Sequence, residues 1–192
     1  MVQDFFDWDV QNFLYFNNLG SEKWDNFWLI ATEKETWIPL YIIFLILLYK
    51  NVGWKKTLVA GICIALMITC ADQLTNVFKN GFQRLRPCHN PDIQGMFRAI
   101  GCEGRGKYGF TSAHASNHIA VAIFVGFVLC KYYKWLLYVL IAWALMIAYS
   151  RVYVGVHYTG DIFFGTLIGI FFAILFLKIY YWILNKYNTS LE

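Results

Sequence analysis

Five apolar stretches set the strongest limit on what this chain can fold into. Four of them are long enough to cross the hydrocarbon core of a bilayer, which takes roughly 20 residues in a helix. They are residues 57–78, 115–130, 135–150 and 161–184. The fifth, residues 37–49, is either interfacial or a span that residues 28–31 extend. Because a chain in lipid must satisfy its backbone hydrogen bonds internally, the sequence predicts an all-α, polytopic bundle of about five to six transmembrane helices.

The composition is typical of a protein that resides in lipid. Hydrophobic residues make up 59% of the 192 residues and charged residues only 15%, which is more apolar surface than a soluble protein of this size can bury. The net charge of +4 is small and scattered, which argues against nucleic acid as a partner. We expect a single domain over residues 1–192, surrounded by lipid. We expect no signal peptide, because no basic stretch precedes an apolar core at the N-terminus.

The N-terminal segment, residues 1–35, differs from the rest because it mixes acids with aromatic side chains. This spacing fits amphipathic helices that lie on the membrane surface with their rings in the bilayer interface. We therefore divide the chain into an interfacial segment at 1–35 and a transmembrane bundle at 36–186. In the last span, Gly165 and Gly169 form a GxxxG step, which allows a neighbouring helix to approach closely.

Lysines in the short connections predict the orientation of the chain. Three regions hold lysines and almost no acids, and short loops of this kind stay in the cytoplasm. These lysines are Lys50, Lys55, Lys56, Lys131, Lys134, Lys178 and Lys186. We therefore expect an integral protein of a bacterial inner membrane whose opposite, more polar loops face the periplasm.

Three polar segments that are distant in the chain emerge on the predicted outer face. They contribute three cations, Lys79, Arg86 and Arg151, and guanidinium groups bind phosphate oxygens two at a time. Ser112 adds a hydroxyl donor. If a helix starts there, with one of the two hydroxyl residues before Ala113 as its N-cap, the backbone amides of residues 112–114, that of Ser112 included, would point at an anion. Together these groups predict a cradle for one phosphate, since phosphoryl transfer depends on positioning and charge stabilisation.

A nucleophile and an acid accompany the predicted cradle. His157 and Asp161 are four residues apart, which would place them one turn apart on one face of a helix. The carboxylate can hold one imidazole N–H and leave the other nitrogen free to attack phosphorus. His114 comes from a different span and can protonate the leaving oxygen, then activate water. The pattern therefore predicts a histidine nucleophile with a separate acid–base histidine.

The three segments also resemble a known signature. They read Lys79-x6-Arg86-Pro87, Ser112-x-His114 and Ser150-Arg151-x5-His157-x3-Asp161. Their order and spacing, over residues 72–169, resemble the type 2 phosphatidic acid phosphatase (PAP2) superfamily. The resemblance implies a bundle of about six helices, metal-independent phosphatase activity and the residue roles argued above. The middle motif of the family usually reads Pro-Ser-Gly-His, so the loop at Thr111-Ser112-Ala113-His114 is where we expect a difference. Soluble vanadium haloperoxidases of the same superfamily do not fit a chain with membrane spans.

Several nearby residues are expected to support the site. Asp72 lies two turns before the lysine of the first motif, and it either orients that lysine or pairs with a nearby asparagine. His118 is expected in a buried, hydrogen-bonded role rather than as a metal ligand. Arg84 either supports the site or contacts a lipid headgroup. Cys88 and Cys102 share the outer loop, where they either pair in an oxidising compartment or stay free.

Together these features predict a membrane lipid phosphatase that forms a phosphohistidine and needs no metal or other cofactor. The lipid chain would remain in the bilayer while its phosphate reaches the site. Candidate substrates are undecaprenyl pyrophosphate, ranked first, phosphatidylglycerophosphate, phosphatidic acid and lipid A. No oligomeric state is predicted. The alternatives are a lipid-phosphate carrier without turnover and a metal-dependent hydrolase that uses His114, His118 and Asp161.

Overall fold

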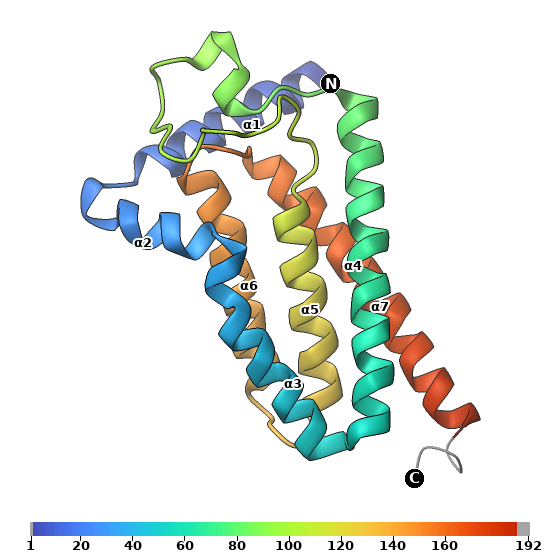
Figure 1. Ribbon diagram of the computed structural model, residues 1–192. Coiled ribbons are helices and arrows are strands. Elements are labelled where there is room, and N and C mark those ends of the chain that lie inside the picture. Colours follow the sequence, from blue (N-terminus) through green and yellow to red (C-terminus); the bar gives the residue numbers. More distant parts are fainter. Residues whose placement is uncertain (1, 188–192) are drawn as a thin grey trace.

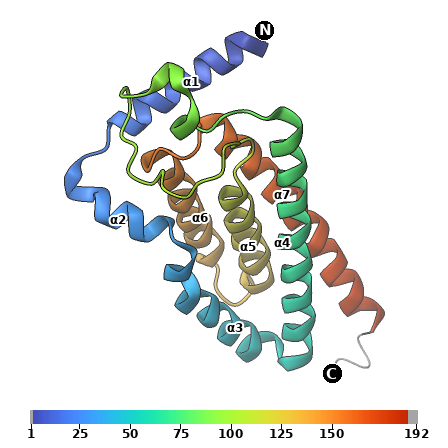
Figure 2. The ribbon, with the colours of Figure 1, turned by 45° about the horizontal axis from the view of Figure 1, so that its top comes forward.

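A computed structural model describes residues 2–187, which form seven α-helices and carry no β-strand (Figure 1). The helices are α1 (Val2–Asn18), α2 (Glu22–Thr32), α3 (Ile38–Val52), α4 (Trp54–Phe82), α5 (Ala113–Leu129), α6 (Leu136–Tyr153) and α7 (Thr159–Lys186). Helices α3 to α7 run side by side as a bundle, and α1, α2 and the loop between α4 and α5 gather at one end (Figures 1 and 2). The predicted all-α helical bundle is confirmed.

Within residues 2–187, four helical segments are long and apolar enough to cross a membrane. They are Lys34–Val52, Trp54–Phe82, Leu136–Tyr153 and Thr159–Lys186. The first reaches 19 residues because a 3₁₀ turn, Lys34–Trp37, precedes α3. The expected extension by residues 28–31 is wrong, since these belong to α2 and the extended backbone at Glu33 (φ −82°, ψ 131°) separates the two helices.

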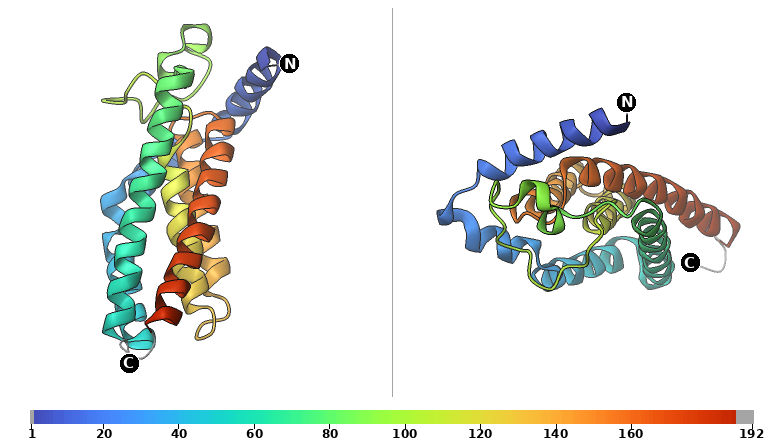
Figure 3. Two further views of the ribbon diagram at one scale, coloured as in Figure 1. Left: turned by 90° about the vertical axis from the view of Figure 1, so that its right-hand side faces the viewer. Right: turned by 90° about the horizontal axis from the view of Figure 1, so that it is seen from above.

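Helix α5 is only 17 residues long and forms the centre of the bundle. It contacts α3, α4, α6 and α7, and most of its side chains are buried (Figure 3). The closest approach is to α7, where a Cβ added to Gly165 would lie 2.5 Å from the carbonyl oxygen of Ser112. At Gly169 the corresponding distance to the oxygen of Ser116 is 2.4 Å. The expected close helix contact at this GxxxG step is confirmed.

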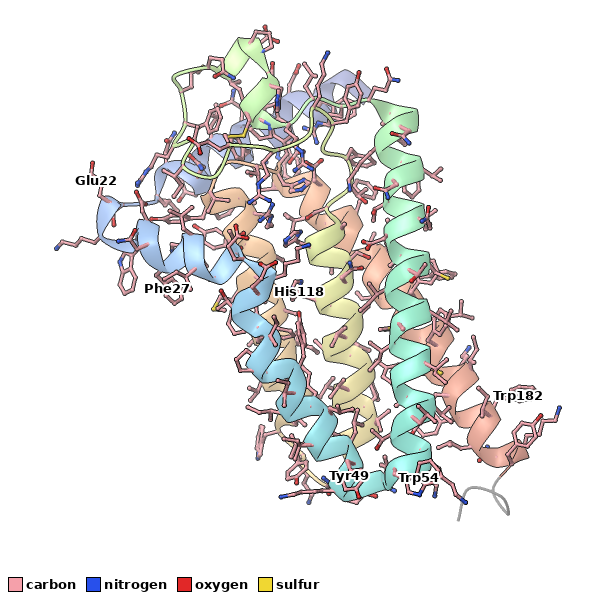
Figure 4. The ribbon with its side chains drawn as sticks, in the orientation of Figure 1. Glu22, Phe27, Tyr49, Trp54, His118 and Trp182 are labelled. Atoms are coloured by element: carbon pink, nitrogen blue, oxygen red, sulfur yellow. A yellow bond between two sulfur atoms is a disulfide. The ribbon has the colours of Figure 1, made fainter. Side chains whose placement is uncertain are left out.

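The two ends of the bundle differ in chemistry. Tyr49, Trp54 and Trp182 lie near the end opposite the long loop (Figure 4), as expected of rings at a membrane interface. At the loop end, α1 buries Asp9, Phe13 and Asn17 against the long loop, the end of α6 and the start of α7, while other rings of α1 and α2 remain exposed. The N-terminal helices are therefore amphipathic, but α1 packs on the protein as well as facing outward.

Candidate active site

Backbone contacts join the three sequence motifs to one another. The first motif pairs with the segment before α5, because Arg86 N donates to Lys107 O (3.0 Å) and Gly109 N donates to Arg84 O (2.9 Å). The second motif meets the third where the amide of Ser112 donates to the carbonyl of Asp161 (3.0 Å). The outer loop is further tied by a disulfide between its two cysteines, Cys88 and Cys102. Segments far apart in sequence thus form one site at the loop end of the bundle.

His157 lies in a tight turn between α6 and α7. The amides of Val156 and His157 both donate to the carbonyl of Arg151 (3.0 and 3.2 Å). The turn needs glycine at Gly155, whose φ is +83° and where a Cβ would meet the carbonyl oxygen of Arg98 at 2.8 Å. The expectation that His157 shares a helix face with Asp161 is therefore wrong, because α7 begins only after the histidine.

Asp161 nevertheless reaches back to His157. It occupies the third position of α7, and its Oδ2 accepts from the amide of Tyr158 (3.0 Å), the N-cap residue. The same oxygen lies 3.1 Å from Nδ1 of His157. This capping arrangement at the start of the helix, rather than helical spacing, brings carboxylate and imidazole together.

Two neighbours of opposite character fix the tautomer of His157. Its Nδ1 faces a carboxylate, which only accepts, and its Nε2 lies 2.8 Å from Nη1 of Arg86, which only donates. The proton is therefore on Nδ1, and Nε2 carries a lone pair. Burial, followed by the charges of Arg86, Arg151 and Lys79, holds the pKa of His157 well below 6.5. The ring is therefore neutral, and the lone pair on its Nε2 accepts a hydrogen bond from Arg86.

The three predicted cations all lie close enough to His157 to lower its pKa. Arg86 Nη1 also donates to the carbonyl of Val156 (3.1 Å), and Arg151 is 2% exposed, with its Nη1 bonded to the hydroxyl of Thr32. Within residues 2–187, the Nε atoms of both arginines are buried without a hydrogen-bond partner. Lys79 is half-buried at the end of α4, with its Nζ 3.4 Å from Asn76 Oδ1. Buried guanidinium donors without an acceptor are what an anion site requires.

The start of α5 contributes fewer hydrogen-bond donors to the predicted anion site than the sequence indicated. Ser112 is the N-cap, and its Oγ accepts from the amide of Ala115 (3.4 Å), which leaves the hydroxyl proton to donate. The backbone amide of Ser112 is occupied by Asp161, so the expectation that it faces the anion is wrong. The amides of Ala113 and His114 remain as first-turn donors.

The supporting residues take partly different places from those expected. Asp72 accepts from Asn117 of α5 (2.8 Å) rather than from the lysine or asparagine of its own helix. His118 is 6% exposed and its Nδ1 lies 2.8 Å from the carbonyl oxygen of His114. The two histidine rings are 6.0 Å apart between centroids (His118 is labelled in Figure 4). No group of three His, Cys, Asp or Glu side chains among the described residues is arranged to hold a metal ion.

Arg84 is largely buried, with 11% of its side chain exposed, and it contacts the carboxylate of the third motif. Its Nη1 bonds Oδ1 of Asp161 (3.1 Å) and Oδ2 of Asp9 (2.7 Å), and its guanidinium lies 3.9 Å from the ring centre of Tyr158. Asp9 was not expected in the site. It lies in the N-terminal segment, which the mixed acids and aromatics indicated only as an interfacial surface.

Two further residues escaped the sequence analysis. Thr32, the last residue of α2, is buried between Ser150 and Arg151. Arg105, on the outer loop, bonds Glu33 (Nη2 to Oε1, 3.3 Å) and the carbonyl of Gly101, and its positive charge helps to lower the pKa of His157. Neither residue belongs to a sequence motif, so nothing in the pattern marked Thr32 or Arg105 as part of the site. Only the presence of several basic residues in the outer loop pointed toward Arg105.

A cavity of about 500 Å³ opens beside His114 between α3, α4 and α5. Its wall is largely apolar along its length, with side chains such as Phe44, Ile68 and Val125, and polar near the site, where Asp72 and Asn117 face it. The cavity therefore extends from the polar cluster into the part of the bundle that lipid surrounds.

A polytopic bundle that gathers three cations around a neutral histidine–carboxylate pair defines an integral membrane phosphatase. The comparison with known families agrees, because the model of the PAP2 superfamily matches residues 57–185. The chain belongs to the PAP2 superfamily.

Individual relatives support this assignment. The chain is 38% identical over its full length to a lipid A 4'-phosphatase of Bacteroides thetaiotaomicron, covering 84% of that protein. It is 32% identical to the Porphyromonas gingivalis lipid A 4'-phosphatase over 88% of this chain and 71% of the other. An undecaprenyl-diphosphatase of Sulfolobus acidocaldarius is 29% identical over 77% of this chain and 65% of its own length.

Two crystal structures share the fold. LpxE from Aquifex aeolicus superposes with a TM-score of 0.62 and 25% identity, over 88% of this chain and 94% of that one. A PAP2-type phosphatidylglycerolphosphate phosphatase from Bacillus subtilis gives a TM-score of 0.68 over 90% of this chain and 84% of the other. Its 19% identity supports the fold alone.

Proposed function

We propose that the protein removes a phosphate from lipid A or a closely related acylated sugar lipid, through a phosphohistidine on His157. Lipid A takes precedence over undecaprenyl pyrophosphate because the relatives with lipid A 4'-phosphatase activity are 38% and 32% identical, against 29% for the undecaprenyl-diphosphatase. The site would lie on the periplasmic face of the inner membrane, since the lysine-rich connections occupy the other end of the bundle.

The reaction would begin as the phosphate draws the guanidinium of Arg86 onto its oxygens. That movement frees Nε2 of His157, which now lies 2.8 Å from Arg86 Nη1. Nε2 attacks phosphorus and the bond to the leaving sugar oxygen breaks. Burial lowers the pKa of His114 in the substrate-free protein, so the negative charge of the bound phosphate would have to raise that pKa for His114 to carry the proton that the leaving oxygen takes. Water then attacks phosphorus, gives its proton to His114, and releases inorganic phosphate and His157. Arg151 and Lys79 stabilise the charge on the transferred group.

The single observation that carries this proposal is that Nδ1 of His157 faces Asp161 while its Nε2 faces Arg86. A lipid-phosphate carrier needs cations, but it gains nothing from an imidazole whose lone pair faces those cations while a buried carboxylate holds its other nitrogen. The cavity beside His114 offers room for an acyl chain that enters from the bilayer between α3 and α4.

Phosphate release by the purified protein tests the proposal. The assay uses lipid A, undecaprenyl pyrophosphate, phosphatidylglycerophosphate and phosphatidic acid, each in the presence of EDTA. We expect release from lipid A to be fastest and the variant His157→Ala to lose roughly 10³-fold or more of the rate. The exposed loop histidine provides the control, His89→Ala, which should keep the parental rate.

Three outcomes would contradict the proposal. Unchanged turnover in His157→Ala would remove the histidine nucleophile. Activity that EDTA abolishes and a divalent metal restores would favour the metal-dependent alternative. Tight lipid binding without phosphate release would favour a carrier.

A further inference from the structure

We propose that Asp9, on α1, is a positioning residue for the catalytic histidine and acts through Arg84 and Asp161. The proposal rests on the proposed function and extends it to a helix that lies outside the matched family region, residues 57–185. It assigns to the N-terminal helix a part in the alignment of the nucleophile.

The carboxylate of Asp9 is fully buried against the start of α7. Its Oδ1 accepts from the amide of Gly160 at 2.6 Å and from the hydroxyl of Thr159, and its Oδ2 bonds Arg84 Nη1 at 2.7 Å. The first amides of a helix carry partial positive charge, so a carboxylate is stabilised there. Gly160 permits this approach, because a Cβ would lie 2.6 Å from Oδ2 of Asp9.

Arg84 carries the contact from Asp9 to the catalytic carboxylate. The same Nη1 atom that bonds Asp9 lies 3.1 Å from Oδ1 of Asp161. Oδ2 of Asp161 bonds Nδ1 of His157 (3.1 Å). The two oxygens of Asp161 thus have different partners, and Arg84 fixes the rotation of the carboxylate that orients the histidine ring. The chain of contacts runs Asp9, Arg84, Asp161, His157.

The helix that presents Asp9 is itself firmly held. One face of α1 buries Asp9, Phe13 and Asn17, which recur every four residues. Phe13 packs edge-on against Phe97 and Tyr158, and Asn17 bonds backbone atoms of the outer loop and the end of α6. Figure 3 shows α1 running beside the start of α7. Such anchoring is what a positioning carboxylate requires, since small displacements at a nucleophile reduce the rate strongly.

The charge of Asp9 also affects the position of Arg84 relative to Asp161. Nη1 of Arg84 bonds both carboxylates, so Asp9 and Asp161 together set the position of this nitrogen. Without the charge on Asp9, Nη1 of Arg84 would shift toward Oδ1 of Asp161 and turn the carboxylate relative to His157. The nucleophile would lose part of its orientation although every residue that touches phosphate remained.

The variant Asp9→Asn tests this arrangement because it keeps the size of the side chain and removes its charge. We expect kcat for phosphate release to fall about 10- to 100-fold, as for other residues that orient a catalytic group. KM should stay within about twofold, because the phosphate contacts are untouched. Formation of phosphohistidine in a single turnover should slow by the same factor as kcat.

Two comparisons separate positioning from folding. Asp25→Asn breaks a similar ion pair between α2 and the outer loop, with Arg98 at 2.6 Å, and it should lower the unfolding temperature without lowering kcat. Arg84→Gln breaks the contact chain at its next link, so Asp9→Asn added to Arg84→Gln should produce little further loss of kcat. Arg84→Gln alone also provides the test if Asp9→Asn does not fold.

The proposal is overturned if folded Asp9→Asn keeps the parental kcat, or if Asp25→Asn loses as much kcat as Asp9→Asn. Fully additive losses in the double variant would also overturn it. In each case the proposed function still stands if His157→Ala remains inactive. Parental activity in His157→Ala would instead remove the proposed function, and the role of Asp9 with it.

Discussion

His157 shows how two neighbours set the chemistry of one side chain. Asp161 accepts from one ring nitrogen and Arg86 donates to the other, so the protein selects a single neutral tautomer before any substrate is present. Burial and nearby cations both disfavour a proton on Nε2. The cost of bringing cations next to a histidine is low here because the ring is uncharged.

This environment predicts the titration of His157. Its pKa lies well below 6.5 because of burial first and Arg86 second. As pH falls from about 8 to 6.5, the ring should therefore stay neutral with its proton on Nδ1. Nitrogen NMR of the histidine-labelled protein without substrate measures this, and His157→Ala assigns the signal. Arg86→Gln removes a cation and should raise the pKa. A parental His157 signal that titrates near 6.5 would contradict the prediction.

At the level of residues, the sequence named side chains that the structure brings together, but not all of their contacts. Motif spacing was sufficient for His157 and Asp161, although the turn at Gly155 and a helix cap, not helical spacing, join them. Asp9 and Thr32 could not be predicted, because their partners lie more than 70 residues away in the chain. A long-range ion pair leaves no periodic signal in a single sequence.

At the level of elements, the close contact of α5 with α7 links the membrane core to the site. Gly165 and Gly169 bring the backbone of α7 onto the carbonyls of Ser112 and Ser116. Ser112 is also the N-cap of α5 and bonds the backbone of Asp161. The packing that holds the helices together therefore sets the distance between the second and third motifs.

Substitution of these glycines should be costly. Gly169→Ala places a methyl group 2.4 Å from a backbone oxygen, so the helices must separate, and we expect a loss of roughly 1–3 kcal/mol. Gly61→Ala is the control and should not destabilise the protein, because nothing beyond the nearby backbone of its own helix lies within 4 Å of the new Cβ. Unfolding in detergent measures both. Equal stability of the two variants would contradict the close packing of α5 on α7. Gly165→Ala should additionally lower activity, since it displaces Ser112.

Hydropathy predicted the elements of the bundle well because lipid imposes length and polarity on each span. It did not reveal the 3₁₀ turn Lys34–Trp37 that completes the first span, since Lys34 and Glu35 interrupt the apolar run. Nor did it show that α1 packs on the loops. Amphipathic patterns indicate that a helix has two faces, and only tertiary structure shows what each face contacts.

For the whole molecule, charge and chemistry separate along the axis of the bundle. The connections that follow α3 and α5 carry lysines with few acids, while the three motifs, the disulfide and α1 lie at the other end (Figure 1). This separation is the physical basis for our proposal that one end faces the cytoplasm and the other the periplasm. A disulfide in the outer loop is consistent with that assignment, because disulfides persist in oxidising compartments.

Cysteine labelling tests the orientation of the molecule directly. In a background in which Cys63, Cys70 and Cys130 are replaced by Ser, Met96→Cys marks the outer loop and Lys134→Cys marks the connection between α5 and α6. Both positions are exposed. A maleimide that reaches the periplasm but cannot cross the inner membrane should label Met96→Cys in cells, and Lys134→Cys only after that membrane is opened. The reverse pattern would place the site in the cytoplasm, and labelling of both positions in intact cells would mean that the bundle between them does not span the membrane. Retention of phosphate release by both variants ensures that the labelled protein has its native fold.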